Sequence, residues 1–287
     1  METDIRNEII QNIKKLPTLP VIFEKILETI DDPHSSANIL QETIKNDQSI
    51  TAKVLNMANS AYYGYAKRVS DLSRAIVILG FDMVKNIALS VSVFNIFHET
   101  EKNNVFFDRE QFWLHSIATG YLGKMIADKI QYFEPDKAFI SCLLHDIGKV
   151  VLDSYFEEKY KLAVETAVVE KIPFRDAERA VIGFDHAEVG FLLGEKWNFP
   201  DELITAIHHH HQPNLSPLRH APLTYLTYLA NIICQEENIG KGGSILPITI
   251  DGKAFSVLSL KSSQEKQIRA EIQNMRSKLE VMLQAIH

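Results

Sequence analysis

Apolar positions recur at steps of three and four along almost the whole chain, whereas the strict alternation typical of strands is scarce. We therefore predict an all-α protein. Capping residues and apolar stripes predict five helices in the first hundred residues, over about 18–30, 35–46, 48–58, 71–80 and 82–97. Further helical segments are predicted near residues 108–130, 135–147, 155–171, 175–182, 187–197, 200–210 and 221–236.

A polar run from His98 to Asn104 predicts a boundary between an N-terminal helical lobe, residues 1–104, and a second lobe, residues 105–237. Residues 238–287 are predicted to be a glycine-containing loop followed by a C-terminal helix. Apolar residues of this helix recur at alternating steps of four and three: Ile268, Ile272, Met275, Leu279, Met282 and Ile286. We expect this seam to dock within the chain, with a homodimer seam as the alternative.

Composition and charge narrow the class of protein. The 287 residues are 46% hydrophobic and 23% charged, which is typical of a globular protein, and the net charge of −7 argues against bulk nucleic-acid binding. The charged N-terminus and the lack of a long apolar run predict a cytoplasmic protein without a membrane span. Cys142 and Cys234 lie in apolar segments and are expected to be reduced core thiols.

The densest chemical signal is the segment Cys142–Lys149, where an apolar helix delivers His145 beside Asp146. An imidazole can ligate one metal ion, and a carboxylate with two oxygens can bridge two ions. Lys149, one turn further on, can neutralise a phosphate or a developing oxyanion. If the protein is an enzyme, we therefore expect Asp146 and Lys149 to be catalytic.

Other candidate ligands are His115, His186 and the run His208–His211. Taken alone, His115 or His186 is more often a hydrogen-bonded core residue than a ligand, and four successive histidines can be a solvated helix end. Together with His145 and Asp146 they form a set of nitrogen and oxygen donors without thiolates. Such a set matches divalent iron, manganese or zinc, and we expect one or two ions.

Four further motifs give the chain its family resemblance: Leu16-Pro17-Thr18-Leu19-Pro20, the run from Asn46 to Leu55, Asn59-Ser60-Ala61-Tyr62-Tyr63-Gly64, and the run from Ala75 to Gly80. In order and spacing the chain resembles the HDOD domain, the HD-related output domain of bacterial signalling proteins. This family is related to the HD and HD-GYP metal-dependent phosphohydrolases. The resemblance implies a two-lobed helical fold, with an N-terminal lobe packed on an HD-like lobe.

The resemblance also implies a ligand set at matching positions. The residues that match metal ligands of the relatives are His115, His145, Asp146, His186, His210 and His211, with His208 or His209 as a replacement for one of the last two. Lys149 matches the lysine of their His-Asp-x-Gly-Lys motif. We expect iron ahead of manganese or zinc.

Three departures from the relatives bear on activity. Asn231 stands where the HD pattern closes with an aspartate, Gln111 replaces a glutamate, and residues 212–215 replace the Gly-Tyr-Pro loop. We therefore expect a regulatory module that acts through signalling proteins in trans. The alternatives are a phosphohydrolase that acts on a nucleotide or cyclic dinucleotide, and a di-iron redox or gas sensor.

Tyr62, Tyr63 and Tyr65 are either a contact patch or core residues.

Overall fold

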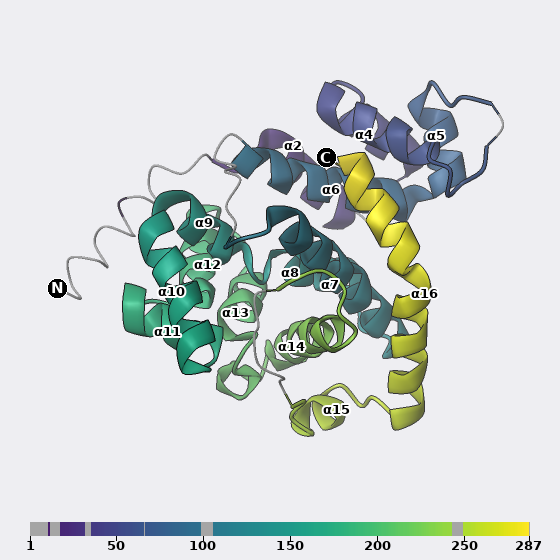
Figure 1. Cartoon of the computed structure of the whole chain (residues 1–287). Helices are drawn as coiled ribbons and strands as arrows, with labels where there is room; N and C mark the ends of the chain where they lie inside the picture. The colour runs from purple at the N-terminus through teal and green to yellow at the C-terminus, as the bar shows by residue number, and fades with distance from the viewer. Residues whose placement is uncertain are drawn as a thin grey trace. The chain divides into compact units, whose positions relative to one another are not determined.

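The computed structural model describes residues 11, 18–31, 36–65, 67–98, 106–242 and 249–286. These residues form helices joined by turns, and no strand occurs among them. The predicted all-α class is confirmed (Figure 1). The elements are α2 (Val21–Asp31), α3 (Ala37–Ile44), α4 (Gln48–Ala58), α5 (Leu72–Leu79), α6 (Phe81–His98), α7 (Arg109–Lys129), α8 (Pro135–Leu144), α9 (Ile147–Tyr155), α10 (Glu157–Glu170), α11 (Phe174–Ile182), α12 (His186–Lys196), α13 (Asp201–His209), η1 (Pro213–Leu215), α14 (Ala221–Glu236), α15 (Lys253–Val257) and α16 (Ser262–Ile286).

The chain divides into two compact units. Pro17–Thr100 and Arg276–His287 belong to one unit, and Glu101–Met275 belong to the other. Helix α16 therefore contributes its first half to one unit and its second half to the other. The predicted boundary run 98–104 lies almost wholly outside the described residues.

Local capping explains where the helices of the smaller unit begin. The side chains of Ser36, Asp47 and Asp71 each accept a hydrogen bond from a backbone N–H three residues later, which satisfies one of the open donors at a helix start. Helix α2 begins at Val21, directly after Pro20, so the helix starts later than predicted. Helix α6 is buried on almost every side and packs against α2, α4 and α5.

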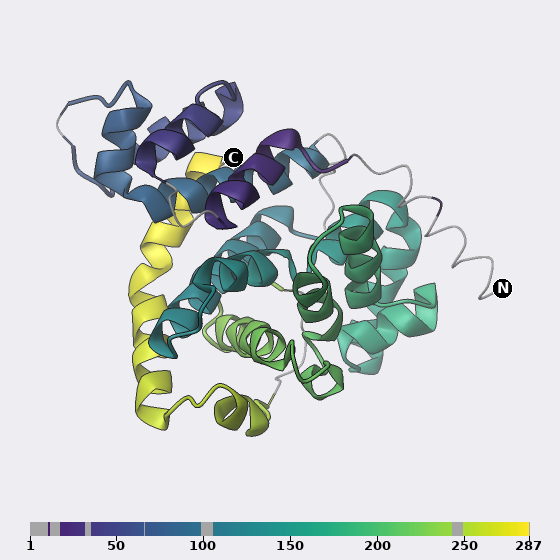
Figure 2. The ribbon, with the colours of Figure 1, turned by 180° about the vertical axis from the view of Figure 1, so that it is seen from behind.

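In the larger unit, α7 packs against α8 and α14, while α12 packs against α9 and α13 (Figures 1 and 2). Long runs of α7 and α14 are buried, because both helices are covered by neighbours on several faces. Cys142 and Cys234 are free and buried, as predicted. Among the described helices, no single one is long and apolar enough to cross a membrane, and α5 with α6 meets that test only as a pair bent by 111°.

The helix predicted near 135–147 is present but ends three residues earlier. Helix α8 ends at Leu144, a turn holds His145 and Asp146, and α9 runs over residues that lie mostly between two predicted segments. Gly148 does not end a helix but lies in the first turn of α9, where a Cβ would lie 2.0 Å from the carbonyl oxygen of His186. Glycine at this position therefore permits the close approach of α9 and α12.

The seam of α16 is largely buried within the chain. Ile268, Ile272, Leu279 and Met282 are at most 1% exposed, and Met275 is partly exposed. The Ile286 side chain lies outside the described residues. The apolar face of α16 thus packs intramolecularly, as the heptad spacing favoured.

Candidate metal centre

Asp146 lies at the meeting point of four helix ends and is fully buried. Its Oδ1 atom is 3.2 Å from Nε2 of His186 and 3.4 Å from Nε2 of His210. Its Oδ2 atom is 3.2 Å from Nε2 of His145 and 2.6 Å from Nζ of Lys149. The two oxygens of one carboxylate therefore face two different groups of side chains.

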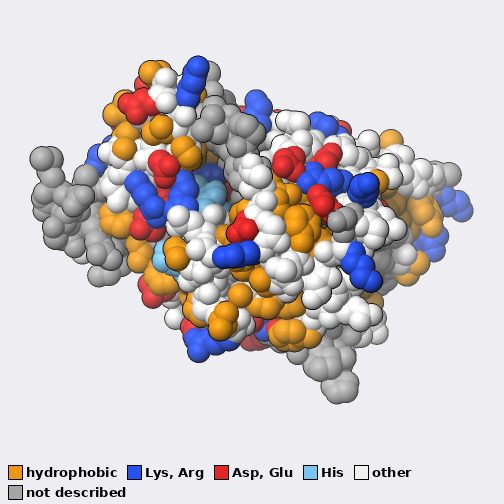
Figure 3. Space-filling view, turned by 90° about the horizontal axis from the view of Figure 1, so that it is seen from below, with side chains coloured by type: hydrophobic (Ala, Val, Ile, Leu, Met, Phe, Trp, Pro, Cys, Tyr) orange, Lys and Arg blue, Asp and Glu red, His pale blue; other side chains and the backbone are white. Residues whose placement is uncertain are grey.

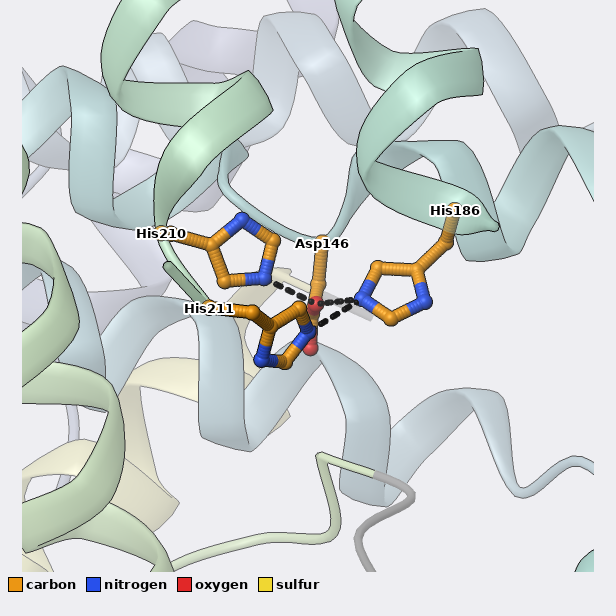
Figure 4. Close-up of side chains that lie close together, drawn as sticks. All are labelled: Asp146, His186, His210 and His211. Carbon is orange, nitrogen blue, oxygen red and sulfur yellow. Dashed lines mark hydrogen bonds and ion pairs between the residues drawn. The ribbon is translucent and has the colours of Figure 1, made fainter. Parts of the chain in front are cut away.

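The first group, the His186 cluster, consists of Asp146, His186, His210 and His211 (Figure 4). His186 is the first residue of α12, and His210 and His211 follow the end of α13. The three imidazoles point towards the carboxylate, and one ligand atom from each of the four residues lies within 4.8 Å of the others. Nε2 of His186 is 2.8 Å from Nε2 of His211.

Backbone carbonyls set the tautomers of two of these histidines. Nδ1 of His145 lies 2.7 Å from the carbonyl oxygen of Cys142, and Nδ1 of His210 lies 2.7 Å from that of Ile207. A carbonyl can only accept, so in each ring Nδ1–H donates and Nε2 keeps its lone pair. Metal-binding histidines are commonly held in this way, with the second nitrogen bonded to a carbonyl or carboxylate.

Glu178 holds the third imidazole and was not identified from the sequence. This fully buried carboxylate lies 2.5 Å from Nδ1 of His186 and also accepts the backbone N–H of His186. Helix α11 buries Phe174, Ala177, Glu178 and Ile182 on one face. A glutamate within an otherwise apolar helical stripe is the sequence signal that would have indicated it.

The three imidazoles of the His186 cluster differ in pKa, and Asp146 carries the negative charge at their centre. Burial lowers the pKa of His210 to about 4 and that of His211 well below its ordinary value, so both rings are neutral near pH 7. Burial also acts on His186, but the Glu178 carboxylate outweighs it and raises the pKa of His186 to about 9. Without a metal this ring is therefore protonated near pH 7, and a bound ion would displace the proton from Nε2. Burial alone would raise the pKa of Asp146, yet His145 and Lys149 hold it well below its usual range.

Several buried atoms at this centre lack a hydrogen-bond partner among the described residues. Oδ1 of Asp146 and Nε2 of His210 face each other at the His186 cluster, and Nε2 of His145 faces the other oxygen of Asp146. Unpaired buried polar atoms are costly, and a set that converges on one point is explained by a ligand. Three imidazole nitrogens and a carboxylate oxygen fit a divalent transition-metal ion. The residues of the His186 cluster therefore fit the metal that the sequence predicts.

The second group, the His115 cluster, consists of His115, His145 and Asp146. Here Nε2 of His115 lies 3.0 Å from Oδ1 of Asn231, and the same oxygen accepts a 2.6 Å hydrogen bond from Nε2 of Gln235. Burial, with the neighbouring His145, lowers the pKa of His115 to about 3. A neutral amide thus occupies the position beside His115 where an anion would serve a metal better.

Two glycines bring the segment Gly240–Gly242, the glycine strap, against the His115 cluster. A Cβ on Gly240 would lie 2.3 Å from the backbone nitrogen of His115, and one on Gly242 would lie 2.7 Å from its Nε2 atom. The carbonyl oxygen of Gly242 also accepts a hydrogen bond from Lys149. The strap therefore covers the imidazole of His115 and binds the ammonium group next to Asp146.

Some predicted residues lie away from this centre. His208 and His209 are partly exposed and stack on each other, with ring centroids 4.5 Å apart, so neither joins the cluster. Histidine atoms reach the face in Figure 3 only as small patches bordered by charged side chains.

Tyr62 and Tyr65 are about half exposed, so the core interpretation is wrong for both.

A cavity of about 330 Å³ adjoins the centre. Phe174 separates the two, because its ring stacks on His186 with centroids 6.3 Å apart and also lines the cavity. The other lining residues are mainly aromatic and apolar, and the glycine strap forms part of the wall: Phe106, Phe107, Tyr160, Val164, Gly240 and Gly242 are among them. The cavity offers room for a small molecule beside the centre.

The model of the HDOD domain family matches residues 16–213, which is more than half of the chain. The chain belongs to the HDOD domain family. It is also 28% identical over 232 residues to an uncharacterized protein of Treponema pallidum (strain Nichols), a match that covers 80% of this chain and 44% of that protein. This HDOD chain thus spans less than half the length of that relative.

Solved structures share the fold. A crystal structure of an HDOD domain protein of unknown function from Geobacter sulfurreducens has a TM-score of 0.81 at 23% identity, covering 98% of this chain and 99% of that one. A protein from Marinobacter aquaeolei VT8, provisionally named as a signal transduction protein, has a TM-score of 0.80 at 23% identity and covers 99% of this chain and 66% of that one. A provisionally named phosphohydrolase from Shewanella amazonensis SB2B has a TM-score of 0.72 at 20% identity, covering 97% and 98%. These likenesses establish the two-lobed HDOD fold.

Proposed function

We propose that this HDOD chain is a regulatory signalling module that binds a divalent metal ion at the His186 cluster and acts through protein partners in trans. The observation that carries the proposal is the convergence of three imidazoles on the buried carboxylate of Asp146. The unpaired Oδ1 of Asp146 and Nε2 of His210 support a cation at this point. Membership of a family of signalling output domains supports the regulatory role.

The donor set favours transition metals over magnesium or calcium. His186, His210 and His211 offer nitrogen, and Asp146 offers one oxygen, whereas magnesium and calcium prefer oxygen ligands throughout. Iron, manganese and zinc all accept such a set, and iron is our first expectation. His186, His210 and Asp146 would hold the ion between α12, the end of α13 and the α8–α9 turn, where it would supply a fixed positive charge.

The contacts of Lys149 weigh against the phosphohydrolase alternative. Its ammonium group is bound by Asp146 and by the carbonyl of Gly242, and the residue is 3% exposed. A lysine held in this way does not offer its charge to a phosphate. Asn231, hydrogen-bonded to His115, removes an anionic ligand position. We therefore favour a binding module over an enzyme.

Exposed apolar side chains support contacts with partner proteins. In the smaller unit, Val21, Tyr62, Tyr65 and Val77 are between 49% and 75% exposed. Aromatic residues on a surface are common in protein interfaces. A nucleotide ligand, for which the cavity beside Phe174 offers room, and a homodimer stay predictions.

Metal analysis tests the proposal directly. The protein is purified without an affinity tag or chelator, and its metal content is measured by plasma mass spectrometry. We expect the wild type to carry iron, manganese or zinc, and His210→Ala to lose it. His209→Ala is the matched control, because it removes the neighbouring imidazole, which does not belong to the cluster. A wild type that neither carries nor takes up metal would overturn the proposal.

A hydrolysis assay separates the module from the enzyme. The metal-loaded protein is incubated with bis(p-nitrophenyl) phosphate and with cyclic di-GMP, and product release is followed. We expect no turnover above that of His210→Ala. Turnover that disappears in His210→Ala but persists in His209→Ala would identify a phosphohydrolase and overturn the non-catalytic assignment.

A further inference from the structure

We infer that this chain binds a single metal ion, at the His186 cluster, and that Lys149, Asn231 and the glycine strap close the His115 cluster to a second ion. The inference rests on the proposed function, because it specifies the ligands and the stoichiometry of the same centre. It also gives Lys149 a role as a positioning residue.

The two oxygens of Asp146 have different partners. A carboxylate that bridges two ions directs one oxygen to each ion. Oδ1 of Asp146 faces His186 and His210 and makes no hydrogen bond with a described residue, so it is available to an ion. Oδ2 accepts a 2.6 Å hydrogen bond from Lys149. An ion at Oδ2 would therefore have to share that oxygen with the ammonium group, whereas an ion at Oδ1 would not.

The positive charge of Lys149 opposes a second ion beside Oδ2 of Asp146. Its ammonium group lies 2.6 Å from Oδ2, the oxygen that a second ion would need, and both side chains are almost completely buried. A divalent ion at that place would face a cation only a few ångströms away, in surroundings that screen charge poorly. The ammonium group supplies the positive charge that Oδ2 would otherwise obtain from a metal.

The hydrogen bonds around His115 place a proton on its Nε2 atom. Oδ1 of Asn231 accepts from Gln235 and lies 3.0 Å from Nε2 of His115, so Nε2 is the donor of that contact. A nitrogen that carries a proton has no lone pair for a metal. His115 therefore presents a protonated Nε2 atom, and the HD-type ligand position at Asn231 presents a neutral group.

The glycine strap covers the His115 ring. Gly242 is buried and lies against the His115 ring so closely that a Cβ would lie between 2.7 and 3.1 Å from three ring atoms. The neighbouring Lys241 N–H donates a 2.9 Å hydrogen bond to the carbonyl of Gln111, which anchors the strap to α7. The strap fills the side of the His115 cluster on which further ligands of a second ion would have to stand.

Manganese titration tests the stoichiometry. Metal-free protein is titrated with Mn²⁺, bound metal is measured by plasma mass spectrometry after desalting, and electron paramagnetic resonance reports whether bound ions are isolated or spin-coupled. We expect one equivalent with the spectrum of isolated Mn²⁺. His115→Ala should keep this equivalent, whereas His210→Ala should lose it.

The outcomes separate the two proposals. Failure of the wild type to bind Mn²⁺, iron or zinc would overturn the proposed function. Two equivalents with a spin-coupled spectrum, of which one is lost in His115→Ala, would overturn the single-ion inference and leave the proposed metal function standing. One equivalent that is lost in His115→Ala but kept in His210→Ala would also overturn the inference.

A double variant tests the cause of closure. Lys149→Met together with Asn231→Asp removes the internal cation and restores an anionic ligand, and we expect it to take up a second equivalent of Mn²⁺. Lys241→Met is the control, because it removes a lysine of the strap whose side chain is 73% exposed. This variant should bind one equivalent of Mn²⁺. Circular dichroism confirms that each variant is folded. A folded double variant that stays at one equivalent would overturn the role given to Lys149 and Asn231.

Discussion

The ammonium nitrogen of Lys149 lies 2.6 Å from Oδ2 of Asp146, at a point where the two side chains are 4% and 0% exposed. This pair connects the α8–α9 turn with the first turn of α9. It also leaves the other oxygen of Asp146 directed at the histidines of α12 and α13. The candidate metal centre and the buried ion pair therefore depend on one carboxylate.

Loss of the ammonium group should destabilise the metal-free protein. Lys149→Met leaves Asp146 buried without its cation, and breaking a buried pair in this way costs about 3–5 kcal/mol. We expect the free energy of unfolding, measured by urea denaturation in the presence of a chelator, to fall by about that amount. Lys241→Met should change it little, because the side chain is mostly exposed. Equal stabilities of wild type and Lys149→Met would show that the histidines alone compensate Asp146.

Replacement of Glu178 should weaken metal binding without removing a ligand. Glu178→Gln keeps the size of the side chain but removes the anion that holds Nδ1 of His186. We expect the dissociation constant for Mn²⁺, measured by isothermal titration calorimetry, to rise about 10- to 100-fold. Glu170→Gln, on the exposed end of α10, is the control. An unchanged affinity in Glu178→Gln would mean that Glu178 does not orient the imidazole.

A methyl group at position 148 should force α9 and α12 apart. In Gly148→Ala the new Cβ would lie 2.0 Å from the carbonyl oxygen of His186. Overpacking of this kind costs about 1–3 kcal/mol, and here it also displaces a proposed ligand. Thermal unfolding should show a lower midpoint for Gly148→Ala than for Gly252→Ala, whose Cβ would meet nothing within 4 Å. Equal midpoints would contradict the close approach of the two helices.

Acid should remove a stabilising contribution of Asp185. Burial alone would raise the pKa of Asp185, but the charges of His186, Arg179 and Arg175 and the backbone N–H of Glu188 hold it below the ordinary value of 3.8. A carboxyl group whose pKa is lower in the folded state stabilises the fold above its unfolded-state pKa. This contribution is lost as the pH falls from about 4 through the lowered folded-state value.

Asp185→Asn tests that contribution, because asparagine can still cap α12 but carries no charge for Arg179. The variant should be less stable than the wild type at pH 6, and the difference should shrink as the pH falls below about 4. Denaturant unfolding across this range is the measurement. Asp201→Asn, with its side chain 84% exposed, is the control and should show a small, constant difference. A constant difference for Asp185→Asn would contradict the pKa argument.

Much of the helical framework follows from local pattern. The caps at Ser36, Asp47 and Asp71 and the apolar stripe of α16 are short-range signals, and the structure has helices where they indicate them. The break at His145–Asp146 was missed, because α8 and α9 are both apolar and their periodicity continues across the turn. Glu178 was missed because its importance depends on a ring eight residues further along the chain.

The candidate donors could be named from the sequence, since His-Asp adjacency and the histidine run identify atoms that bind transition metals. The sequence by itself thus determined the helical class and the types of ligand, because both depend on spacing along one helix or on side-chain chemistry. Only the tertiary structure decided which donors share a centre. Asp146 faces His186 and His210 on one side and Lys149 on the other because α9, α12, α13 and the glycine strap meet there. Contacts between segments so far apart in the chain arise from packing, which no local pattern encodes.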